Sequence, residues 1–176
     1  MNKDGLVVYI GVGSNIDPKE NIRKALDLLK KGSEVRVTGI SSFYSTTPVN
    51  RTNQDSYLNG IFETRTDITA EDFKTRILSP IEKELKRERK RDRFASRTID
   101  LDILLYGDLC IEDMGIPDQD IYTRNFVAVP LRELDSQLVL PDSGMKIADL
   151  SLSEEIESMQ FEKVFTDELR ERIIDE

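Results

Sequence analysis

The sequence has no histidine, no tryptophan and a single cysteine among its 176 residues. Without histidine, a Ser-His-Asp triad, a thiol activated by imidazole and a metal site built on helical histidines are all excluded. One cysteine excludes a disulfide framework and a cysteine-rich zinc site. Any chemistry in this chain must therefore rest on carboxylates, Arg and Lys side chains, hydroxyls and backbone amides.

Long apolar runs are missing as well. No stretch approaches the roughly 18 apolar residues that a membrane-spanning helix needs, and the N-terminal residues do not resemble a signal peptide. We therefore expect a soluble, cytoplasmic protein with no membrane partner. The length suits one domain with an appended tail, and a chain of this size can bury a core without disulfides.

Charge is abundant but unevenly distributed. The net charge is −9, which argues against non-specific binding to nucleic acid. Residues 151–176 hold nine acidic and three basic residues, whereas residues 83–97 hold eight basic and three acidic ones. We predict a domain over residues 1–150 and an acidic, helical C-terminal extension over residues 151–176. The extension's apolar residues fall at spacings that one helix face would share: Ile156, Met159, Phe161, Phe165, Leu169 and Ile173.

Apolar periodicity and turn residues predict four strands and two main helices. The strands are expected over residues 6–10, 35–44, 57–66 and 99–106, and the helices over residues 18–31 and from Thr69 to Leu85, where Pro80 should kink the helix or mark a break near Leu78. This order is the ferredoxin-like βαββαβ plan, an α+β fold with an antiparallel sheet and two helices on one face. A short helix is expected over residues 127–134 and an edge piece over residues 139–141.

The last predicted strand carries an unusual pair of carboxylates, Asp100 and Asp102. Side chains alternate along a strand, so the two aspartates should share one face, about 6.5–7 Å apart. Their apolar neighbours should take the other face: Ile99, Leu101, Ile103 and Leu105. Asp is uncommon in strands and like charges repel, so a positive partner is expected. Mg²⁺ suits two carboxylates, but a solvated face or a pairing with arginine is the plainer interpretation.

A cationic segment immediately precedes this strand, with basic residues Arg87, Arg89, Lys90, Arg91, Arg93 and Arg97. By itself such a segment is most often a solvated surface. Next to a strand with two carboxylates, it favours a magnesium–polyphosphate site. In such a site the carboxylates hold the metal, the metal bridges phosphate oxygens, and the guanidinium groups neutralise charge that develops during transfer.

Two other patterns are weaker. Gly11 and Gly13 follow the first strand, but Ile16 stands where a dinucleotide fingerprint has its third glycine, so we interpret the pair mainly as backbone geometry. The loop from Thr46 to Val49, with Tyr57, Asn59 and Phe126, combines aromatic rings with amide donors and acceptors. Each is more often core or turn, but together they would suit a flat heteroaromatic ligand.

Several motifs occur in order along residues 7–150: Tyr9-Ile10-Gly11-Val12-Gly13-Ser14-Asn15, Ser41-Ser42-Phe43-Tyr44, Thr46-Thr47-Pro48, Tyr57-Leu58-Asn59 and Arg97-Thr98-Ile99-Asp100-Leu101-Asp102-Ile103-Leu104-Leu105-Tyr106-Gly107. Together they resemble the 6-hydroxymethyl-7,8-dihydropterin pyrophosphokinase family of folate biosynthesis. The resemblance implies transfer of a pyrophosphoryl group from ATP to the hydroxymethyl group of the dihydropterin, with release of AMP. ATP and the dihydropterin would be the partners, and two Mg²⁺ ions the cofactors.

The resemblance also implies roles for individual residues. The catalytic set would be Arg87, Arg97, Asp100 and Asp102, of which Asp100 and Asp102 would hold the metal and Asp102 is a candidate base. The pterin would contact Thr46, Pro48, Val49, Tyr57, Asn59 and Phe126. The nucleotide would contact Glu82, Arg89, Arg93, Arg97, Ile103 and Arg124. The basic loop over residues 87–97 matches the family's mobile lid.

Four places depart from the family pattern, all of them on the nucleotide side. Ser79 stands for the usual Gln, Phe94 for Trp, Ala95-Ser96 for Gly-Pro and Asp118 for His. We therefore expect weaker ATP binding, and a catalytically silent homologue that binds pterin or nucleotide is an alternative. An RNA-binding module is a third possibility, disfavoured by the acidity and by the lack of paired aromatics on the strand over residues 57–66. A monomer or weak dimer is expected.

Overall fold

The computed structural model describes residues 5–47, 55–87, 96–152 and 159–174. Its strands join in one sheet, in which neighbouring strands of the described residues run antiparallel. They are β1 (Leu6–Ser14), β2 (Val35–Ile40), β3 (Tyr44–Thr46), β4 (Tyr57–Thr66), β5 (Asp100–Tyr106) and β6 (Met159–Phe161). The order β5-β1-β4-β2 is the ferredoxin-like core, so the predicted α+β fold is confirmed.

The predicted strand over residues 35–44 is two strands, and the single-strand prediction is wrong. β2 and β3 both pair with the edge of β4 that faces away from β1, one after the other. Between β2 and β3, the Ile61 backbone N–H donates to the Ser41 hydroxyl at 2.8 Å, so a side chain takes the place of a backbone hydrogen bond between the strands. β6 then pairs with the free edge of β3, which extends the sheet beyond the core plan.

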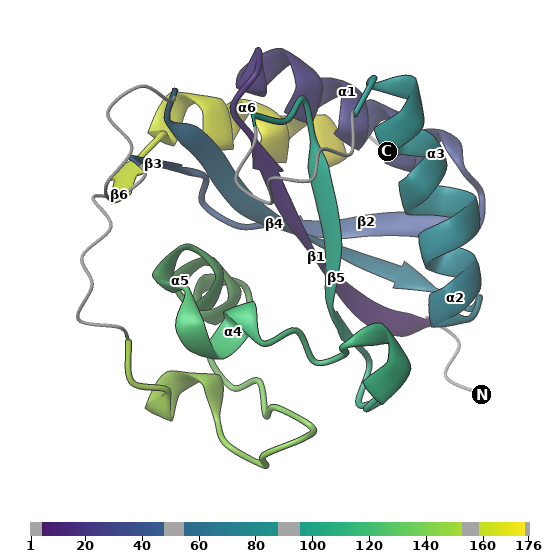
Figure 1. Ribbon diagram of the computed structural model, residues 1–176, viewed down its shortest axis with the longest axis vertical. Helices are drawn as coiled ribbons and strands as arrows, with labels where there is room; N and C mark the ends of the chain where they lie inside the picture. Colours follow the sequence, from purple (N-terminus) through teal and green to yellow (C-terminus); the bar gives the residue numbers. More distant parts are fainter. Residues whose placement is uncertain (1–4, 48–54, 88–95, 153–158, 175–176) are drawn as a thin grey trace.

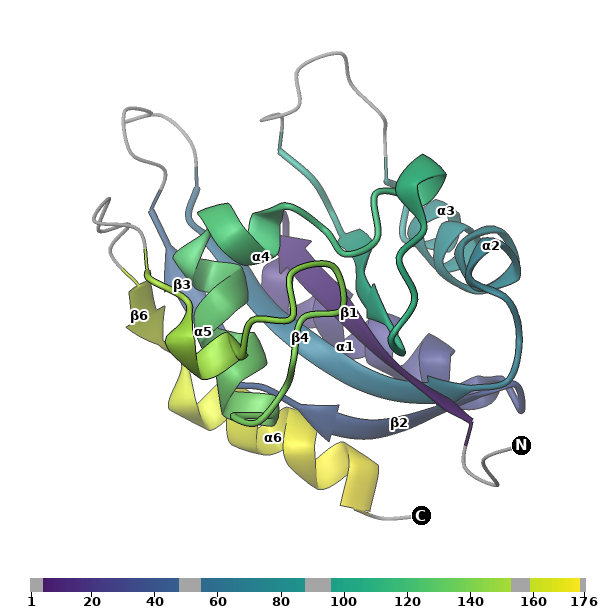
Figure 2. The ribbon, with the colours of Figure 1, turned by 90° about the horizontal axis from the view of Figure 1, so that it is seen from below.

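Helices cover both faces of the sheet (Figures 1 and 2). On one face lie α1 (Pro18–Lys31), α2 (Ala70–Asp72), α3 (Ser79–Glu84) and α6 (Lys163–Ile174), around a core that includes Ile10 and Leu26. On the other lie α4 (Asp120–Thr123) and α5 (Asn125–Leu134), around a smaller core that includes Ile61 and Leu131. Short 3₁₀ turns span Glu112–Met114 and Ile147–Asp149. The short helix predicted over residues 127–134 is confirmed as α5, and it covers the face of the sheet opposite α1 and α3.

The helical segment after Thr69 shows how its proline is accommodated. The Thr69 hydroxyl caps the start by accepting the Asp72 N–H at 3.1 Å, as its position predicts. Between α2 and α3 the turns widen to π-helical geometry over Phe73–Leu78, and Pro80 lies in the first turn of α3, where its missing N–H has least effect. The helix therefore continues through Pro80 rather than breaking there.

β5 departs from simple alternation by a bulge. Its pairing with β1 runs from Tyr9↔Leu105 directly to Ile10↔Ile103, which leaves Leu104 as an extra residue. Leu101 and Ile103 lie in the core beneath α1 and α3, as predicted. Leu105 lies instead in the core beneath α5, so the prediction that it shares their face is wrong, because the bulge shifts the alternation by one residue.

The C-terminal segment is also different from a single helix. Met159 and Phe161 lie in β6, so their predicted places on a helix face are wrong, because edge pairing with β3 takes up these residues instead. Ile156 lies outside the described residues. α6 follows, and it buries Phe165 and Leu169 against the sheet and α1. Among the described residues, no helix has the length and apolar character needed to cross a membrane.

Candidate functional site

Asn59, Gly13 and Asp100 form a row across β4, β1 and β5. Adjacent strands lie about 4.8 Å apart, so the backbones of Asn59 and Asp100 are separated by about 10 Å. A Cβ built on Gly13 would lie 3.0 Å from Asn59 Oδ1 and 4.0 Å from Asp100 Cβ. The amide and the carboxylate therefore lie on one face of the sheet, on either side of a position where any side chain would crowd the amide.

Two arginines hold the Asp100 carboxylate, which is 9% exposed. Arg97 donates a hydrogen bond to Oδ2, and Arg87 forms an ion pair with Oδ1 that lacks hydrogen-bond geometry. Arg87 also donates to Glu82, whose buried carboxylate accepts the Leu101 N–H at 3.0 Å. The structure thus brings four of the predicted residues into one network: Glu82, Arg87, Arg97 and Asp100. An internal pairing with arginine, the plainer interpretation of the sequence, applies to Asp100.

Asp102 has different surroundings. It lies two residues further along β5, opposite Gly11, and its side chain is half-buried. In the described parts of the chain it has no ion pair. Asp118 lies within electrostatic reach. Burial raises the pKa of Asp118, and the negative charges of Asp120 and Asp102 raise it further. Asp102 and Asp118 therefore bring negative charge together, and neither has an ion-pair partner among the described side chains.

The backbone of Arg97 is held by residues that the sequence patterns did not single out for this purpose. Asn15 Oδ1 accepts the Arg97 N–H at 2.7 Å, and the N–H groups of Asn15 and Ile16 donate to the Arg97 carbonyl at 3.1 Å. The buried Ser14 hydroxyl donates to the Thr98 carbonyl at 2.5 Å. The polar residues after the first strand were the available signal, because buried Ser and Asn need hydrogen-bond partners.

A neutral cluster lies at the opposite end of the row. Asn59 Nδ2 donates to Thr46 Oγ1 at 2.9 Å, and both residues are buried. Tyr57 pairs with Thr46 in the register of β3 and β4, and its alternation places it on the same face as Asn59. Phe126 of α5 packs against the core on that face. Pro48 and Val49 lie outside the described residues.

α5 braces β3 on this face through one carboxylate. Glu133 accepts the Ser42 N–H at 3.1 Å and the hydroxyl of Tyr44. Burial, reinforced by the hydrogen bond to Glu133, raises the pKa of Tyr44 to about 12. The tyrosine therefore stays protonated as a donor at neutral pH.

Only some of the residues predicted to contact the nucleotide lie beside the aspartates. Ile103 is buried in the core beneath α1 and α3, so its side chain does not share the face of the aspartates. Arg124 lies between α4 and α5, with its Nε 3.9 Å from Asp120 Oδ1. Arg89 and Arg93 lie outside the described residues, as do the departures Phe94 and Ala95.

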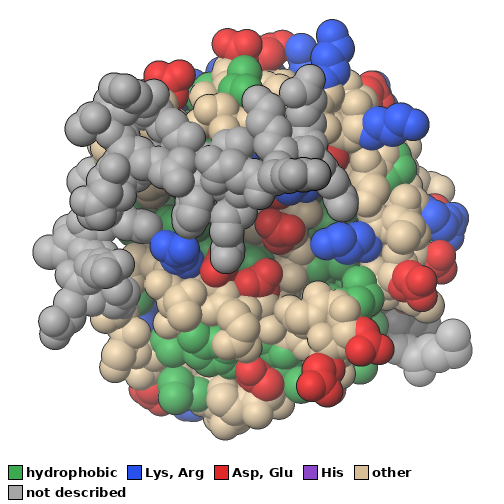
Figure 3. Space-filling model, viewed as in Figure 1, with side chains coloured by type: hydrophobic (Ala, Val, Ile, Leu, Met, Phe, Trp, Pro, Cys, Tyr) green, Lys and Arg blue, Asp and Glu red, His purple; other side chains and the backbone are tan. Residues whose placement is uncertain are grey.

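The donor set suits a hard cation. Mg²⁺ commonly takes one or two carboxylates and fills its other positions with water and phosphate oxygens. Asp100 and Asp102 provide two on one face, although the described residues contain no group of three or more acidic, His or Cys side chains that could hold a metal by themselves. On the face of the molecule shown in Figure 3, acidic and basic side chains lie close together near the centre.

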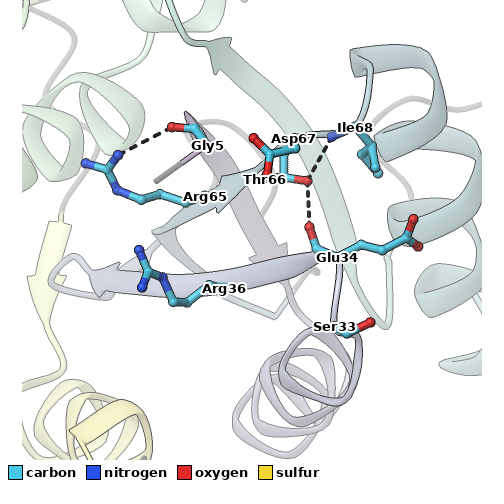
Figure 4. Close-up of a pocket in the computed structure, with 8 residues that line it drawn as sticks. All are labelled: Gly5, Ser33, Glu34, Arg36, Arg65, Thr66, Asp67 and Ile68. Atoms are coloured by element: carbon cyan, nitrogen blue, oxygen red, sulfur yellow. Dashed lines mark hydrogen bonds between the residues drawn. The ribbon is translucent and has the colours of Figure 1, made fainter. Parts of the chain in front are cut away.

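A hollow at the far end of the sheet has a different character (Figure 4). Gly5 and Thr66 line it, one residue before the start of β1 and at the end of β4, whereas Gly13 and Asn59 lie near the other end of the same pair. Arg65 in its wall donates to the Gly5 carbonyl at 3.4 Å, and Glu34 is paired with Arg76 at 2.9 Å. About seven residues of β1 separate this hollow from the row formed by Asn59, Gly13 and Asp100.

The fold and this row of residues define the class of protein: it is an α+β protein with a ferredoxin-like core, and it carries a carboxylate–arginine network and a buried amide on one face of its sheet. The sequence model of the 7,8-dihydro-6-hydroxymethylpterin-pyrophosphokinase (HPPK) family matches residues 9–136. The chain belongs to this family, and the predicted resemblance is confirmed.

Relatives with curated names agree. The chain is 38% identical over 141 residues to the 2-amino-4-hydroxy-6-hydroxymethyldihydropteridine pyrophosphokinase of Haemophilus influenzae, covering 78% of this chain and 87% of that protein. It is 37% identical over 135 residues to the Bacillus subtilis protein of the same name, covering 75% and 80%. A crystal structure of a Plasmodium falciparum HPPK-DHPS triple mutant with pteroate superposes with a TM-score of 0.62 at 12% identity, over 85% of this chain and 43% of that one. That likeness shows the fold.

Proposed function

We propose that this protein transfers the pyrophosphoryl group of ATP to the hydroxymethyl group of 6-hydroxymethyl-7,8-dihydropterin. The hydroxyl oxygen bonds to the β-phosphorus, the bond from that phosphorus to the bridging oxygen of the α-phosphate breaks, and AMP leaves. The hydroxyl proton passes to a base. Membership of the HPPK family over residues 9–136 is the observation that carries this conclusion.

The acceptor half would be the neutral cluster. The Asn59 amide and Thr46 hydroxyl can present a donor and an acceptor to the edge of a pterin, and they are already oriented by their mutual hydrogen bond. Tyr57 and Phe126 provide rings on the same face, and Pro48 and Val49 complete the proposed pterin set. A ligand held here would direct its hydroxymethyl group along the row toward Asp100 and Asp102.

The donor half would be the charged network. Arg87 and Arg97 are placed to neutralise phosphate charge, once their contacts with Asp100 are exchanged for phosphate oxygens. Asp100 and Asp102 would hold Mg²⁺, which supplies charge neutralisation and alignment of the polyphosphate when bound. Asp102, half-buried and without an ion pair among the described residues, is the proposed base. Glu82, Arg89, Arg93, Arg124 and the backbone of Ile103, whose side chain is buried in the core, complete the proposed nucleotide set.

Turnover tests the proposal directly. Purified protein incubated with ATP, Mg²⁺ and the dihydropterin should form one AMP for each pterin diphosphate, without ADP. Asp102→Asn should remove this activity while leaving the fold intact by circular dichroism. Asp108→Asn, on the exposed turn just beyond β5, is the matched control and should behave as wild type.

A binding protein without catalysis would give a different result. Calorimetry would then detect the dihydropterin while AMP never forms, and the enzyme proposal would fail. We further propose a cytoplasmic protein that works without nucleic acid, as a monomer or weak dimer. Sedimentation at micromolar concentration and an oligonucleotide shift assay at low salt test the last two points.

A further inference from the structure

The acidic C-terminal segment contacts the acceptor half at β3. β6 pairs with β3 so that Met159 lies opposite Thr46 and Phe161 opposite Tyr44. The rings of Tyr44 and Phe161 lie 5.8 Å apart. The strand that carries Thr46 therefore has β4 on one side and the C-terminal segment on the other.

Residues at the start of α6 also form hydrogen bonds with the backbone of Phe43, which precedes β3. The Phe43 N–H donates to Thr166 Oγ1 at 2.9 Å, and both residues are fully buried. The Phe43 carbonyl accepts the Glu162 N–H at 2.9 Å. Both backbone groups of Phe43 thus have their partners in the C-terminal segment, and neither group could reach water instead.

Phe43 in turn contacts the strand that carries Asn59. Its ring lies over Gly60, where a Cβ would come within 2.6 Å of the ring, so only glycine allows this approach. The ring also contacts Phe62 of β4 and Phe165 of α6, at centroid distances of 5.9 and 5.7 Å. A displacement of Phe43 would therefore be passed both to Thr46 through β3 and to Asn59 through Gly60.

α6 is itself anchored on α1 by charge. Glu168 accepts two hydrogen bonds from Arg23, at 2.6 and 2.7 Å, and the Arg23 guanidinium lies 5.2 Å from the centre of the Phe165 ring. Lys19 pairs with Glu162 at 2.9 Å. Two acidic residues of the segment, Glu162 and Glu168, thus dock it on basic side chains of α1.

We propose that Thr166 is a positioning residue for the pterin site, acting through Phe43 on the hydrogen-bonded pair of Thr46 and Asn59. The proposal rests on the proposed function, which places the pterin at that pair. In this view β6 and α6 are part of the acceptor half of the enzyme. Among the described residues, the nucleotide half, built around Asp100 on the opposite edge of β1, has no such contact with Thr166.

The test compares Thr166→Val with Thr166→Ser in the full-length protein. Valine matches threonine in shape but leaves the buried Phe43 N–H without an acceptor, whereas serine keeps the acceptor. We expect Thr166→Val to raise the KM and the calorimetric Kd for the dihydropterin by about tenfold, with the KM for ATP unchanged. Thr166→Ser should restore most of the affinity, and Val164→Ala, at an exposed position on the same helix, should have no effect.

Three results would overturn the proposal. The dihydropterin constants could stay at wild-type values in Thr166→Val, the KM values for both substrates could rise equally, or the melting temperature alone could fall. If Thr166→Val does not fold, Thr166→Ala takes its place, because it also removes the hydroxyl that accepts the Phe43 N–H. A selective loss of dihydropterin affinity relative to Thr166→Ser supports the proposal, and wild-type affinity refutes it. A wild-type protein that binds the dihydropterin but makes no AMP would refute the proposed function alone, since the binding comparison would still stand.

Discussion

The two ends of the row across β4, β1 and β5 are built from different interactions. At β5, Asp100 is held by the guanidinium groups of Arg87 and Arg97. At β3 and β4, Thr46 and Asn59 are joined by a neutral hydrogen bond and braced by packed rings. Ion pairs can exchange one anion for another, so the charged end can rearrange when a polyphosphate arrives. The neutral end is preset, because the hydrogen bond between Asn59 and Thr46 fixes the orientation of both buried side chains.

The largest effect should come from breaking the charged end. Asp100→Ala would remove a proposed metal ligand and leave two arginines without their carboxylate. We expect AMP formation to fall by about 10³-fold or more, as for other groups that stabilise charge in phosphoryl transfer. A coupled assay for AMP measures this. Dihydropterin affinity should stay near wild type, and a parallel loss of that affinity would show that the two ends are not separable.

A change at the neutral end should weaken binding of the dihydropterin and leave binding of the nucleotide unchanged. Asn59→Ala removes a buried amide that would otherwise pair with the pterin, so the Kd for the dihydropterin should rise by about tenfold to a hundredfold. The Kd for a non-hydrolysable ATP analogue should stay the same. Titration calorimetry with each ligand gives both constants. Equal losses for both ligands would contradict the division into two halves.

Asp118 adds negative charge near the charged end, at a position where the sequence resemblance leads us to expect histidine. Asp118→His should tighten the binding of the ATP analogue by about tenfold, or 1.4 kcal/mol, because a carboxylate that repels phosphate is removed. Calorimetry at pH 7 checks this, with Asp113→His on the exposed 3₁₀ turn as the control. Unchanged affinity in Asp118→His would mean that this carboxylate does not face the nucleotide.

The same aspartate predicts a pH effect on stability. The pKa of Asp118 is raised in the folded protein, mainly by burial, so its charged form opposes folding at neutral pH. Asp118→Asn should therefore raise the melting temperature at pH 7. The gain should shrink as the pH falls through the folded pKa, and vanish below the unfolded pKa of about 3.9. Thermal melts from pH 3 to 7 measure it.

The smallest effect belongs to the docking of α6. Hydrogen bonds from Arg23 lower the pKa of Glu168, so its contribution to stability is present above the unfolded pKa and is lost as the pH falls through the folded value. Glu168 is about one-third exposed, so Glu168→Gln should cost less than about 1 kcal/mol at pH 7. The difference from wild type should shrink as the pH falls through the folded pKa of Glu168, as measured by urea titrations over a range of acidic pH. A difference that does not change with pH would point to packing rather than charge.

The order of strands and helices and several residues of the site could be predicted from the sequence, because local patterns carry that information. Period-two alternation placed Asp100 and Asp102 on one face, and the motif order indicated the family. Sequence reasoning could not find the split between β2 and β3, because Ser41 satisfies a backbone group that a continuous strand would have paired. It also missed the bulge at Leu104, since one extra residue leaves no sign in the apolar pattern. Asn15 belongs to one of the sequence motifs, but its hydrogen bond with Arg97 joins residues 82 positions apart, so local pattern could not predict it.

By itself the sequence determined the chemistry available, because the absence of histidine and the single cysteine leave carboxylates and arginines to act on phosphate, and local periodicity specifies strands and helices. Only the tertiary structure decided which of these groups meet. The hold of Asn15 on Arg97, the approach of Asn59 across Gly13 and the contact of Thr166 with Phe43 all join segments distant in sequence. Such contacts depend on how the sheet pairs and twists, and that is settled by the packing of the whole core rather than by any local pattern.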